Sequence, residues 1–482
     1  MGDERAEIYL GRLAEAELRR VGDQLRRLDA AAADPWADPG MPLFGIAEDA
    51  SWKVGRAARI LVAAGLLDQD YVHDAGADLG AAIQVRSRLL LNWYRRQGVL
   101  HRTIFGPRVP PPSRGARQPM RVTPAGRALP GTSDRAPWTL HLMSLMRTET
   151  EAVITVAMRM HWPPDESSTA GAGAGAGPHQ LPYHQLWAVD DQGTRYRVRF
   201  EGGRGGTATW LGHARLAPVP PRAARWLDLV GDGTHLVRLP LGPPAPPGRQ
   251  AAPPTTEPTA TGLGERLLVL EAEHILTTGD ATGGARGQVG GPSPGEIITV
   301  LMAAGGIAAG SPVPAQLAAL CQRLGATGHH ITVPPGEELP APWASVIAHR
   351  DAPVPTGLPE VFAPLACVLP DVDGARFALA GLSTIAGETH LHVISSGMPR
   401  LAGRFQWDWT PGFSWWLRDS AGNWHVGSPG EPDTYGEGMS LYTFGDGLQA
   451  FWLRLTPPLT APPGAAEIVV TGPSTRVRAT VS

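Results

Sequence analysis

Three histidines in the second half of the chain have the residue type and spacing of a metal site. His390 and His392 alternate along one expected strand, so their side chains share a face, and His425 follows an expected hairpin turn. Neutral imidazoles bind zinc, and three of them can form a metal centre. The matching positions of the first half hold other residues, namely Glu151, Val153 and Tyr196. Since isolated histidines are more often packed without a role, we expect no metal and no cofactor.

Other catalytic patterns are equally scarce. The chain has no His-Glu-x-x-His and no Gly-x-Gly-x-x-Gly after an expected strand. Its single lysine, Lys53, lies in Ser-Trp-Lys-Val, which excludes a Walker phosphate-binding loop and leaves Schiff-base chemistry to one residue. The adjacent carboxylates Asp190 and Asp191 lie at an expected hairpin turn, and that position accounts for them. We therefore expect a protein that is not an enzyme and has no catalytic residue.

A basic stretch between residues 79 and 133 is the first candidate for binding. It contains ten arginines and no acidic residue, with Trp93 and Tyr94 interleaved. Arginines of this kind contact phosphates, so the stretch could bind nucleic acid. The alternative is a solvated helix face followed by a basic linker. The candidate binding residues in the expected helix are Arg86, Arg88, Arg95, Arg96 and Arg102.

Five tryptophans between residues 405 and 426 are the second candidate. Trp416 has a counterpart in Trp187 and is expected in a β core, as is Trp415, which replaces a leucine. The remaining three, Trp407, Trp409 and Trp424, are aromatic only in the second half. They could stack on a carbohydrate or a partner, or cover a sheet edge.

An internal repeat organises these candidates. Residues 186–198 match 415–426 with a constant offset of 229, which superposes Asp190 on Asp419 and Gly193 on Gly422. Residues 138–156 match 377–395 without a gap, and three upstream positions match as well: Pro124, Leu129 and Pro130 with Pro364, Leu369 and Pro370. Residues 56–67 also resemble 296–307, so helical segments repeat along with the β segments.

The repeat predicts an α+β protein built as a tandem duplication, in which a small helical module precedes an antiparallel β-sandwich. Asp-x-x-Gly between two short strands indicates a hairpin with a type I turn and a glycine of positive φ. Several short strands over about 120 residues are typical of an immunoglobulin-like sandwich. The expected domains are helical 1–105, β 119–242, a proline-rich linker 243–261, helical 262–345 and β 358–482.

Composition limits the class of protein. The 482 residues carry a formal charge of −3, but residues 257–482 hold eleven arginines against twenty acidic residues while residues 1–256 have a net +6. Such halves could dock on each other or on other copies of the chain. Two cysteines provide no disulfide framework. The charged N-terminus lacks a signal-peptide core, and the longest apolar run is too short to span a bilayer, so we expect a cytoplasmic protein and no membrane partner.

The Asp-x-x-Gly-x-x-Tyr/His hairpin, the later Pro-Pro-x-Ala stretch and the Ala-Ala-Gly helical segment resemble an uncharacterised actinobacterial family of hypothetical proteins. The resemblance covers most of the chain and implies the architecture, but it implies no activity. We expect a non-catalytic protein-interaction or scaffold protein. The alternatives are nucleic-acid association through the arginines of residues 86–127 and carbohydrate binding by the tryptophan-rich second β module.

Overall fold

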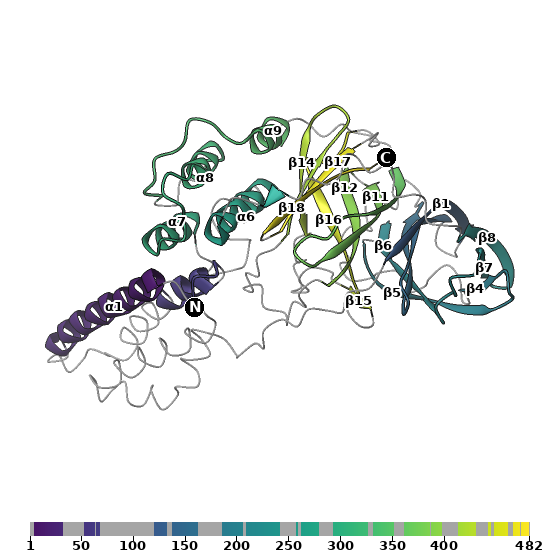
Figure 1. The fold of residues 1–482 in the computed structure, drawn as a ribbon, viewed down its shortest axis with the longest axis horizontal. Coiled ribbons are helices and arrows are strands. Elements are labelled where there is room, and N and C mark those ends of the chain that lie inside the picture. Colours follow the sequence, from purple (N-terminus) through teal and green to yellow (C-terminus); the bar gives the residue numbers. More distant parts are fainter. Residues whose placement is uncertain are drawn as a thin grey trace. The chain divides into compact units, whose positions relative to one another are not determined.

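A computed structural model describes the chain in discrete stretches (Figure 1). The described residues are 4–31, 53–62, 64–67, 120–132, 137–161, 186–205, 209–241, 257–258, 262–278, 293–325, 331–350, 361–385, 387–397, 413–429, 442–444, 448–460, 466–472 and 474–481. They divide into two compact units. Unit 1 comprises residues 1–111, 259–340 and 405–412, and unit 2 comprises residues 112–258, 341–404 and 413–482. Each unit therefore takes parts from both halves of the chain.

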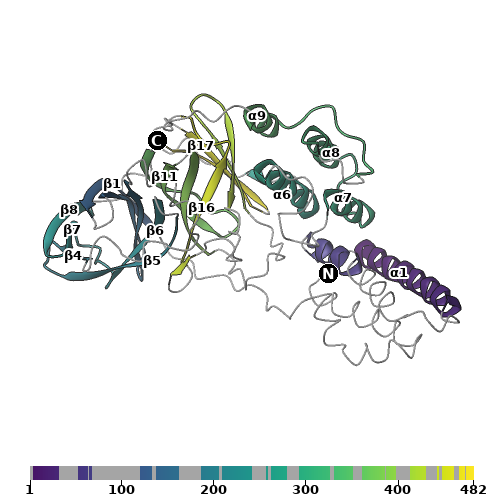
Figure 2. The ribbon, with the colours of Figure 1, turned by 180° about the vertical axis from the view of Figure 1, so that it is seen from behind.

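Unit 1 is helical. Helix α1 (Glu4–Ala31) and a helical segment at 53–62 come from the first half. The second half contributes α6 (Leu263–Thr278), α7 (Pro294–Ala303) and α8 (Val313–Arg323), which contact one another and lie side by side in both views (Figures 1 and 2). Apolar side chains such as Leu10, Leu61, Leu268 and Leu301 are buried, as the helical spacing requires.

The helical segments of the two halves end in the same way. After 53–62 the amides of Ala64 and Gly65 bond to the carbonyls of Ile60 and Val62, and Gly65 has a φ of +69°. After α7, at positions 240 residues further along, Ala304 and Gly305 make the corresponding bonds to Val300 and Met302, and Gly305 has a φ of +76°. Glycine reaches this conformation without steric penalty, which explains the shared Ala-Ala-Gly.

The first β module occupies residues 121–240 of unit 2. Its eight antiparallel strands form one sheet in the order β1-β2-β3-β6-β5-β4-β7-β8. The strands are β1 (Arg121–Thr132), β2 (Pro137–Arg147), β3 (Ala152–Met160), β4 (Leu186–Asp190), β5 (Arg195–Gly205), β6 (Thr209–Ala217), β7 (Trp226–Gly231) and β8 (Thr234–Pro240). Because β1 also contacts β8, the sheet is barrel-like around a core that includes Leu140, Ile154, Tyr196 and Leu227.

The second β module, residues 361–481, repeats this order as β10-β11-β12-β16-β14-β13-β17-β18 and resembles half of a barrel. Its strands are β10 (Val361–Val368), β11 (Arg376–Ile385), β12 (Glu388–Ser396), β13 (Ser414–Arg418), β14 (Trp424–Pro429), β15 (Tyr442–Phe444), β16 (Leu448–Thr456), β17 (Ala466–Thr471) and β18 (Thr475–Val481). A two-residue strand β9 (Glu257–Pro258), from the segment expected to be a linker, pairs with β18. Helix α9 (Ala341–Arg350) packs on β14 and belongs to this unit, whereas the expected helical module extended to residue 345.

Bulges show which strands correspond. β1 and β10 are both interrupted after a proline, Pro124 and Pro364, and this agrees with the sequence match. β2 and β11 carry single-residue bulges at Met143 and Ala380, which are 237 positions apart. The sequence match of 138–156 to 377–395 has an offset of 239, whereas the bulges give an offset of 237. The match is therefore wrong by two residues, because the first module has a longer connection between its first two strands.

The two β modules pack on each other within unit 2. A buried cluster joins Val122, Met146 and Val153 of the first to Ala380, Ile394 and Ala450 of the second. Beside it, His141 stacks on Phe362 with ring centroids 3.8 Å apart, and His213 stacks on Trp452 at 6.0 Å. The outer faces of β2, β3, β6 and of β11, β12, β16 are thus interaction surfaces inside the chain.

Mixed helices and large antiparallel sheets confirm the α+β class. Each β module is one continuous sheet, and the immunoglobulin-like arrangement stays a prediction. None of the helices in the described stretches combines the length and apolarity needed to cross a membrane.

Candidate functional site

The first hairpin shows what the repeated Asp-x-x-Gly-x-x-Tyr/His pattern does in this chain. Between β4 and β5, Asp190 accepts hydrogen bonds at Oδ1 from the backbone amides of Gln192 (2.9 Å) and Thr194 (2.8 Å). Its Oδ2 accepts one from the hydroxyl of Tyr196 at 2.5 Å. Burial favours the neutral acid, but these donors outweigh it and hold the pKa of Asp190 below its usual value. Gly193 has a φ of +80°, as the turn requires.

The second hairpin repeats the design with a different donor. Asp419 Oδ1 accepts from the amide of Asn423 at 2.8 Å, and Oδ2 lies 3.4 Å from Nε2 of His425. The other ring nitrogen, Nδ1, donates to the carbonyl of Pro457 at 2.6 Å. Burial opposes ionisation of Asp419, and the bonds from Asn423 and His425 outweigh it, so its pKa is lowered. His425 thus ties the turn to the strand end after β16.

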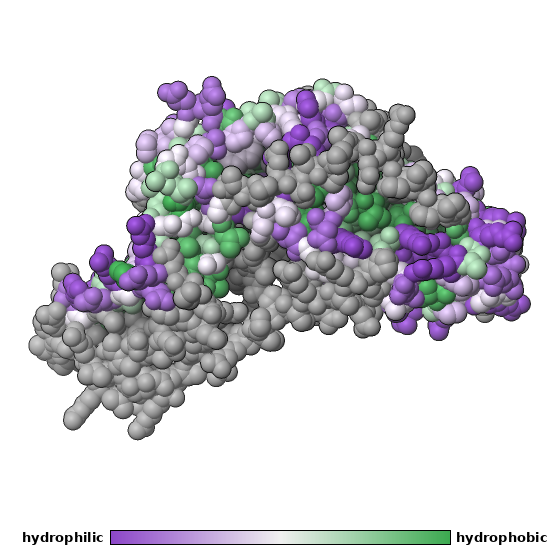
Figure 3. Space-filling model, viewed as in Figure 1, coloured by the Kyte–Doolittle hydropathy of each residue, from purple (hydrophilic) through white to green (hydrophobic). Residues whose placement is uncertain are grey.

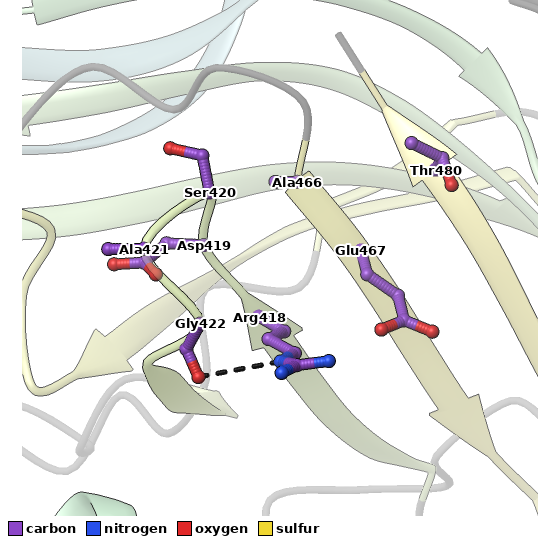
Figure 4. Close-up of a pocket in the computed structure, with 8 residues that line it drawn as sticks. All are labelled: Arg418, Asp419, Ser420, Ala421, Gly422, Ala466, Glu467 and Thr480. Atoms are coloured by element: carbon purple, nitrogen blue, oxygen red, sulfur yellow. Dashed lines mark hydrogen bonds between the residues drawn. The ribbon is translucent and has the colours of Figure 1, made fainter.

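A surface pocket of about 450 Å³ lies beside this second turn (Figure 4). The turn residues 419–422 form one wall, and side chains of β13, β17 and β18 form the other: Arg418, Glu467 and Thr480. Arg418 Nε donates to the carbonyl of Gly422 at 3.4 Å, drawn as a dashed line in Figure 4. Glu467 also accepts an ion-pair contact from Arg478 at 3.2 Å. The pocket therefore offers fixed donors and acceptors around a small space.

Trp424 borders this region. It is half-buried, lies edge-on to Trp416 with centroids 6.3 Å apart, and has the guanidinium of Arg418 5.7 Å from its ring centre. Trp407 and Trp409 lie outside the described residues, so a surface formed by all three stays a prediction. The structure thus gives Trp424 two neighbours, an aromatic ring and a cation.

The buried tryptophans differ from expectation in one respect. Trp415 and Trp416 are both buried, as predicted, with 4% and 8% of their surface exposed. Only Trp415 joins the core of the second β module. Trp416 lies on the opposite, outer face because side chains alternate along a strand, and its counterpart Trp187 lies half-buried on the outer face of the first module.

The arginines predicted from the basic stretch, Arg86, Arg88, Arg95, Arg96 and Arg102, fall outside the described residues. Two others from the same stretch, Arg121 and Arg127, lie exposed on β1. The nucleic-acid hypothesis for residues 86–127 therefore stays a prediction.

The three histidines of the imagined metal site have separate environments. His390 lies 3.6 Å from Glu388, His392 Nε2 lies 3.0 Å from the hydroxyl of Ser383, and His425 binds the hairpin as above. Among the residues that the structure describes, no group of three or more histidine, cysteine or acidic side chains could hold a metal ion.

Sequence reasoning missed the pairing of Ser383 with His392. Both side chains are fully buried where the β modules meet. Burial and the nearby His213 and His390 depress the pKa of His392 far below its ordinary value, so its imidazole is neutral. A neutral histidine hydrogen-bonded to a serine hydroxyl is the pair of groups that serves as base and nucleophile in covalent catalysis. Here both groups lie inside a packed interface, where the bond links the neighbouring strands β11 and β12 of the second module.

A second serine has the spacing of a nucleophile elbow, which sequence reasoning also missed. Gly-Pro-Ser-Pro-Gly at 291–295 places Ser293 immediately before α7. Its hydroxyl accepts a hydrogen bond from the amide of Glu296 at 3.2 Å, and Pro294 occupies the first helical position. This is the geometry of a helix N-cap, which accounts for the serine and the proline.

Comparison with known proteins adds no functional residue, since no family model, no curated protein and no solved structure matches the chain. The site must be interpreted from its own geometry.

Proposed function

We propose that the chain is a non-catalytic protein-interaction or scaffold protein built by tandem duplication of a helical module and a β module. The observation that supports this most is the use of sheet faces as docking surfaces. The outer face of β2, β3 and β6 receives the second β module, and the outer face of β14 receives helix α9. A module that binds protein on two faces within its own chain has surfaces suited to other proteins.

The polar groups at the described turns support the same reading. Asp190, Asp419, Tyr196 and His425 are engaged in holding hairpins, and the buried Ser383 and His392 are engaged with each other across two neighbouring strands. The opposite net charges of the two halves favour self-association or binding of a charged partner. We also propose that the modules are immunoglobulin-like and in tandem, that the protein is cytoplasmic and that it is of actinobacterial origin.

Co-purification tests the scaffold function. The full chain, immobilised and exposed to an extract of its own organism, is expected to retain at least one protein in reproducible stoichiometry. Cross-links from that protein should map to the β modules. In parallel, light scattering should show a mass that falls toward the monomer as salt rises, if copies associate through charge. A chain that stays monomeric at low salt and retains no protein above a bead control contradicts the proposal.

Carbohydrate binding by the second β module is the second candidate, and the pocket beside Trp424 favours it. Proteins bind sugars with planar polar side chains next to an aromatic ring. Arg418 lines the pocket and also lies over the ring of Trp424. A glycan array probed with the full chain should give hits that Trp424→Ala and Arg418→Ala both weaken. Substitution of the exposed Arg222, on the first module, serves as the control. An array without hits removes this candidate.

A further inference from the structure

Strand β5 presents a row of arginines to solvent. Arg195, Arg197 and Arg199 are exposed, whereas Tyr196 and Val198 between them point into the core of the first β module. Successive members of the row lie roughly 6.6 Å apart, because a strand rises about 3.3 Å per residue. None of the three forms an ion pair with another described residue. Hydrophilic side chains cover much of the first module in the space-filling view (Figure 3).

The fold does not require arginine at these positions. The offset of 229 that superposes Asp190 on Asp419 pairs the three arginines with Trp424, Val426 and Ser428 of β14. Val426 is fully buried but lies outside the core of the second module. Helix α9 packs on this strand, and the hydroxyl of its Ser345 accepts from the amide of Trp424 at 3.1 Å. The same sheet face is thus apolar and covered in one module, basic and open in the other.

The arginine row also carries electrostatic repulsion. Arg199 lies directly opposite Arg215 of β6 in the strand register. Like charges in this position destabilise a sheet, and only Arg215 has a described counterion, Glu151 at 2.6 Å. An arrangement that the fold does not need and that lowers its stability points to a ligand of opposite charge.

An aromatic ring completes the surface. Trp187 of β4 lies directly opposite Arg197 in the register, and the guanidinium of Arg195 sits 4.9 Å from the centre of its ring. Trp187 is half-exposed. A base can stack on such a ring while the arginines contact its backbone, and single-stranded nucleic acid is bound in this way.

We propose that the outer face of β5, with Arg195, Arg197, Arg199 and Trp187, binds the phosphate backbone of single-stranded nucleic acid. An acidic helix of a partner protein is the competing occupant. α9 packs on β14, which holds Trp424 and Val426 in the second module. The first module has arginine at both matching positions, so the apolar surface that a helix needs is missing. A line of evenly spaced guanidinium groups suits an extended chain of phosphates instead. This site is separate from the arginines of residues 86–102 and does not depend on the scaffold function.

Fluorescence anisotropy of a labelled oligothymidylate with the full chain tests the proposal. Three phosphate contacts give a salt slope near −2, so affinity should fall roughly 20-fold between about 50 and 200 mM salt. The variant Arg195→Gln/Arg197→Gln/Arg199→Gln should lose most of this binding and most of the salt dependence. The matched control Arg222→Gln/Arg225→Gln/Arg238→Gln removes the same charge from exposed arginines of the same module, outside residues 86–127, and should bind like the wild type.

Circular dichroism should show both variants folded, since the substituted side chains are exposed. The proposal is overturned if the wild type does not bind at low salt, or if the two variants bind equally. A poly-glutamate competitor that displaces the oligonucleotide at equal residue concentration would reassign the face to acidic proteins. Failure here would leave co-purification of a protein partner unaffected.

Discussion

Arg56 and Glu296 occupy equivalent positions in the two halves of the chain, 240 residues apart, and they form an ion pair. Arg56 Nε lies 3.3 Å from Glu296 Oε1, and the two side chains are 22% and 28% exposed. Equivalent residues meet in this way near a two-fold axis. In a dimer of identical copies such a position would bring like charges together. If the chain arose by the proposed duplication, the two positions are free to carry opposite charges, as Arg56 and Glu296 do.

The β modules follow the same rule with aromatic rings. His213 of β6 pairs with Thr155 of β3, and Trp452 of β16 pairs with His392 of β12. Thr155 and His392 are matching positions of the two modules, so His213 and Trp452 match as well. They stack on each other across the contact between modules. In each unit, segments from the two halves of the chain therefore pack on each other. The residues that meet are at matching positions but differ chemically.

Removing the hydroxyl of Tyr196 should lower the stability of the first hairpin without changing its fold. Tyr196→Phe deletes the bond to Asp190, and loss of a buried bond to a charged group should lower the free energy of unfolding by about 1.5–3 kcal/mol. Burial, then the bond to Asp190, raises the pKa of Tyr196 to about 12. Wild-type stability is therefore present below pH 10 and lost as pH rises toward 12. Urea titrations across this range should show a larger loss in the wild type than in Tyr196→Phe, which keeps only the effect of Tyr9, whose pKa burial also raises.

Buried histidines should make unit 2 sensitive to mild acid. Burial lowers the pKa of His213 to about 3, and that of His392 is also far below its ordinary 6.5. Each is neutral when folded and gains a proton when unfolded below pH 6.5, so stability falls as pH drops. Burial also lowers the pKa of His141, which stacks on Phe362, to about 4, so three such groups should remove roughly 4 kcal/mol by pH 5.5. Depressed carboxyl groups such as Asp190 act only below about pH 4, which separates the two effects.

Chemical unfolding at pH 7.5 and 5.5 measures this acid effect. His392→Gln should be less stable than the wild type at pH 7.5, because the bond with Ser383 is altered. It should also lose about two thirds as much stability on acidification, because His213 and His141 remain. An equal pH-dependent loss in the wild type and the variant contradicts the assignment of His392 as a buried neutral group.

Close helix packing in unit 1 predicts opposite effects of two glycine substitutions. A Cβ at Gly264, in α6, would lie 2.2 Å from the carbonyl oxygen of Gly306, which is backbone and cannot rotate away. Gly264→Ala should therefore destabilise the chain by about 1–3 kcal/mol. Gly11, in α1, has no atom within 4 Å of such a Cβ, and Gly11→Ala should stabilise by about 0.5–1 kcal/mol. Thermal unfolding of the two variants gives the comparison, and equal melting temperatures would refute the close approach.

The hairpins could be predicted from sequence because their signals are local. Asp190 and Gly193, like Asp419 and Gly422, fix a turn through bonds within five residues, and both glycines have positive φ. The role of Tyr196 and His425 in anchoring the aspartate is equally local, yet it needs the side chains placed in space. The signal in the sequence was a Tyr or His six residues after the Asp in both hairpins.

Long-range relationships could not be predicted in the same way. Nothing in the sequence shows that the helical segments assemble together while the β modules pair, since that depends on contacts between residues more than 200 positions apart. The outward direction of Trp416 follows from strand alternation once β13 is placed by its register. The exposed row on β5 was visible as alternating arginines, but its exposure became evident only beside the covered β14.

A double-mutant cycle on Arg56 and Glu296 tests the pairing of equivalent positions most directly. Arg56→Ala, Glu296→Ala and the double variant are unfolded in urea, with the exposed pair Arg19 and Glu15 of α1 as a control cycle. We predict a coupling of about 0.5–1 kcal/mol for Arg56 with Glu296 and about 0.5 kcal/mol or less for the control. Additive effects of Arg56→Ala and Glu296→Ala would contradict the contact between the two helical modules.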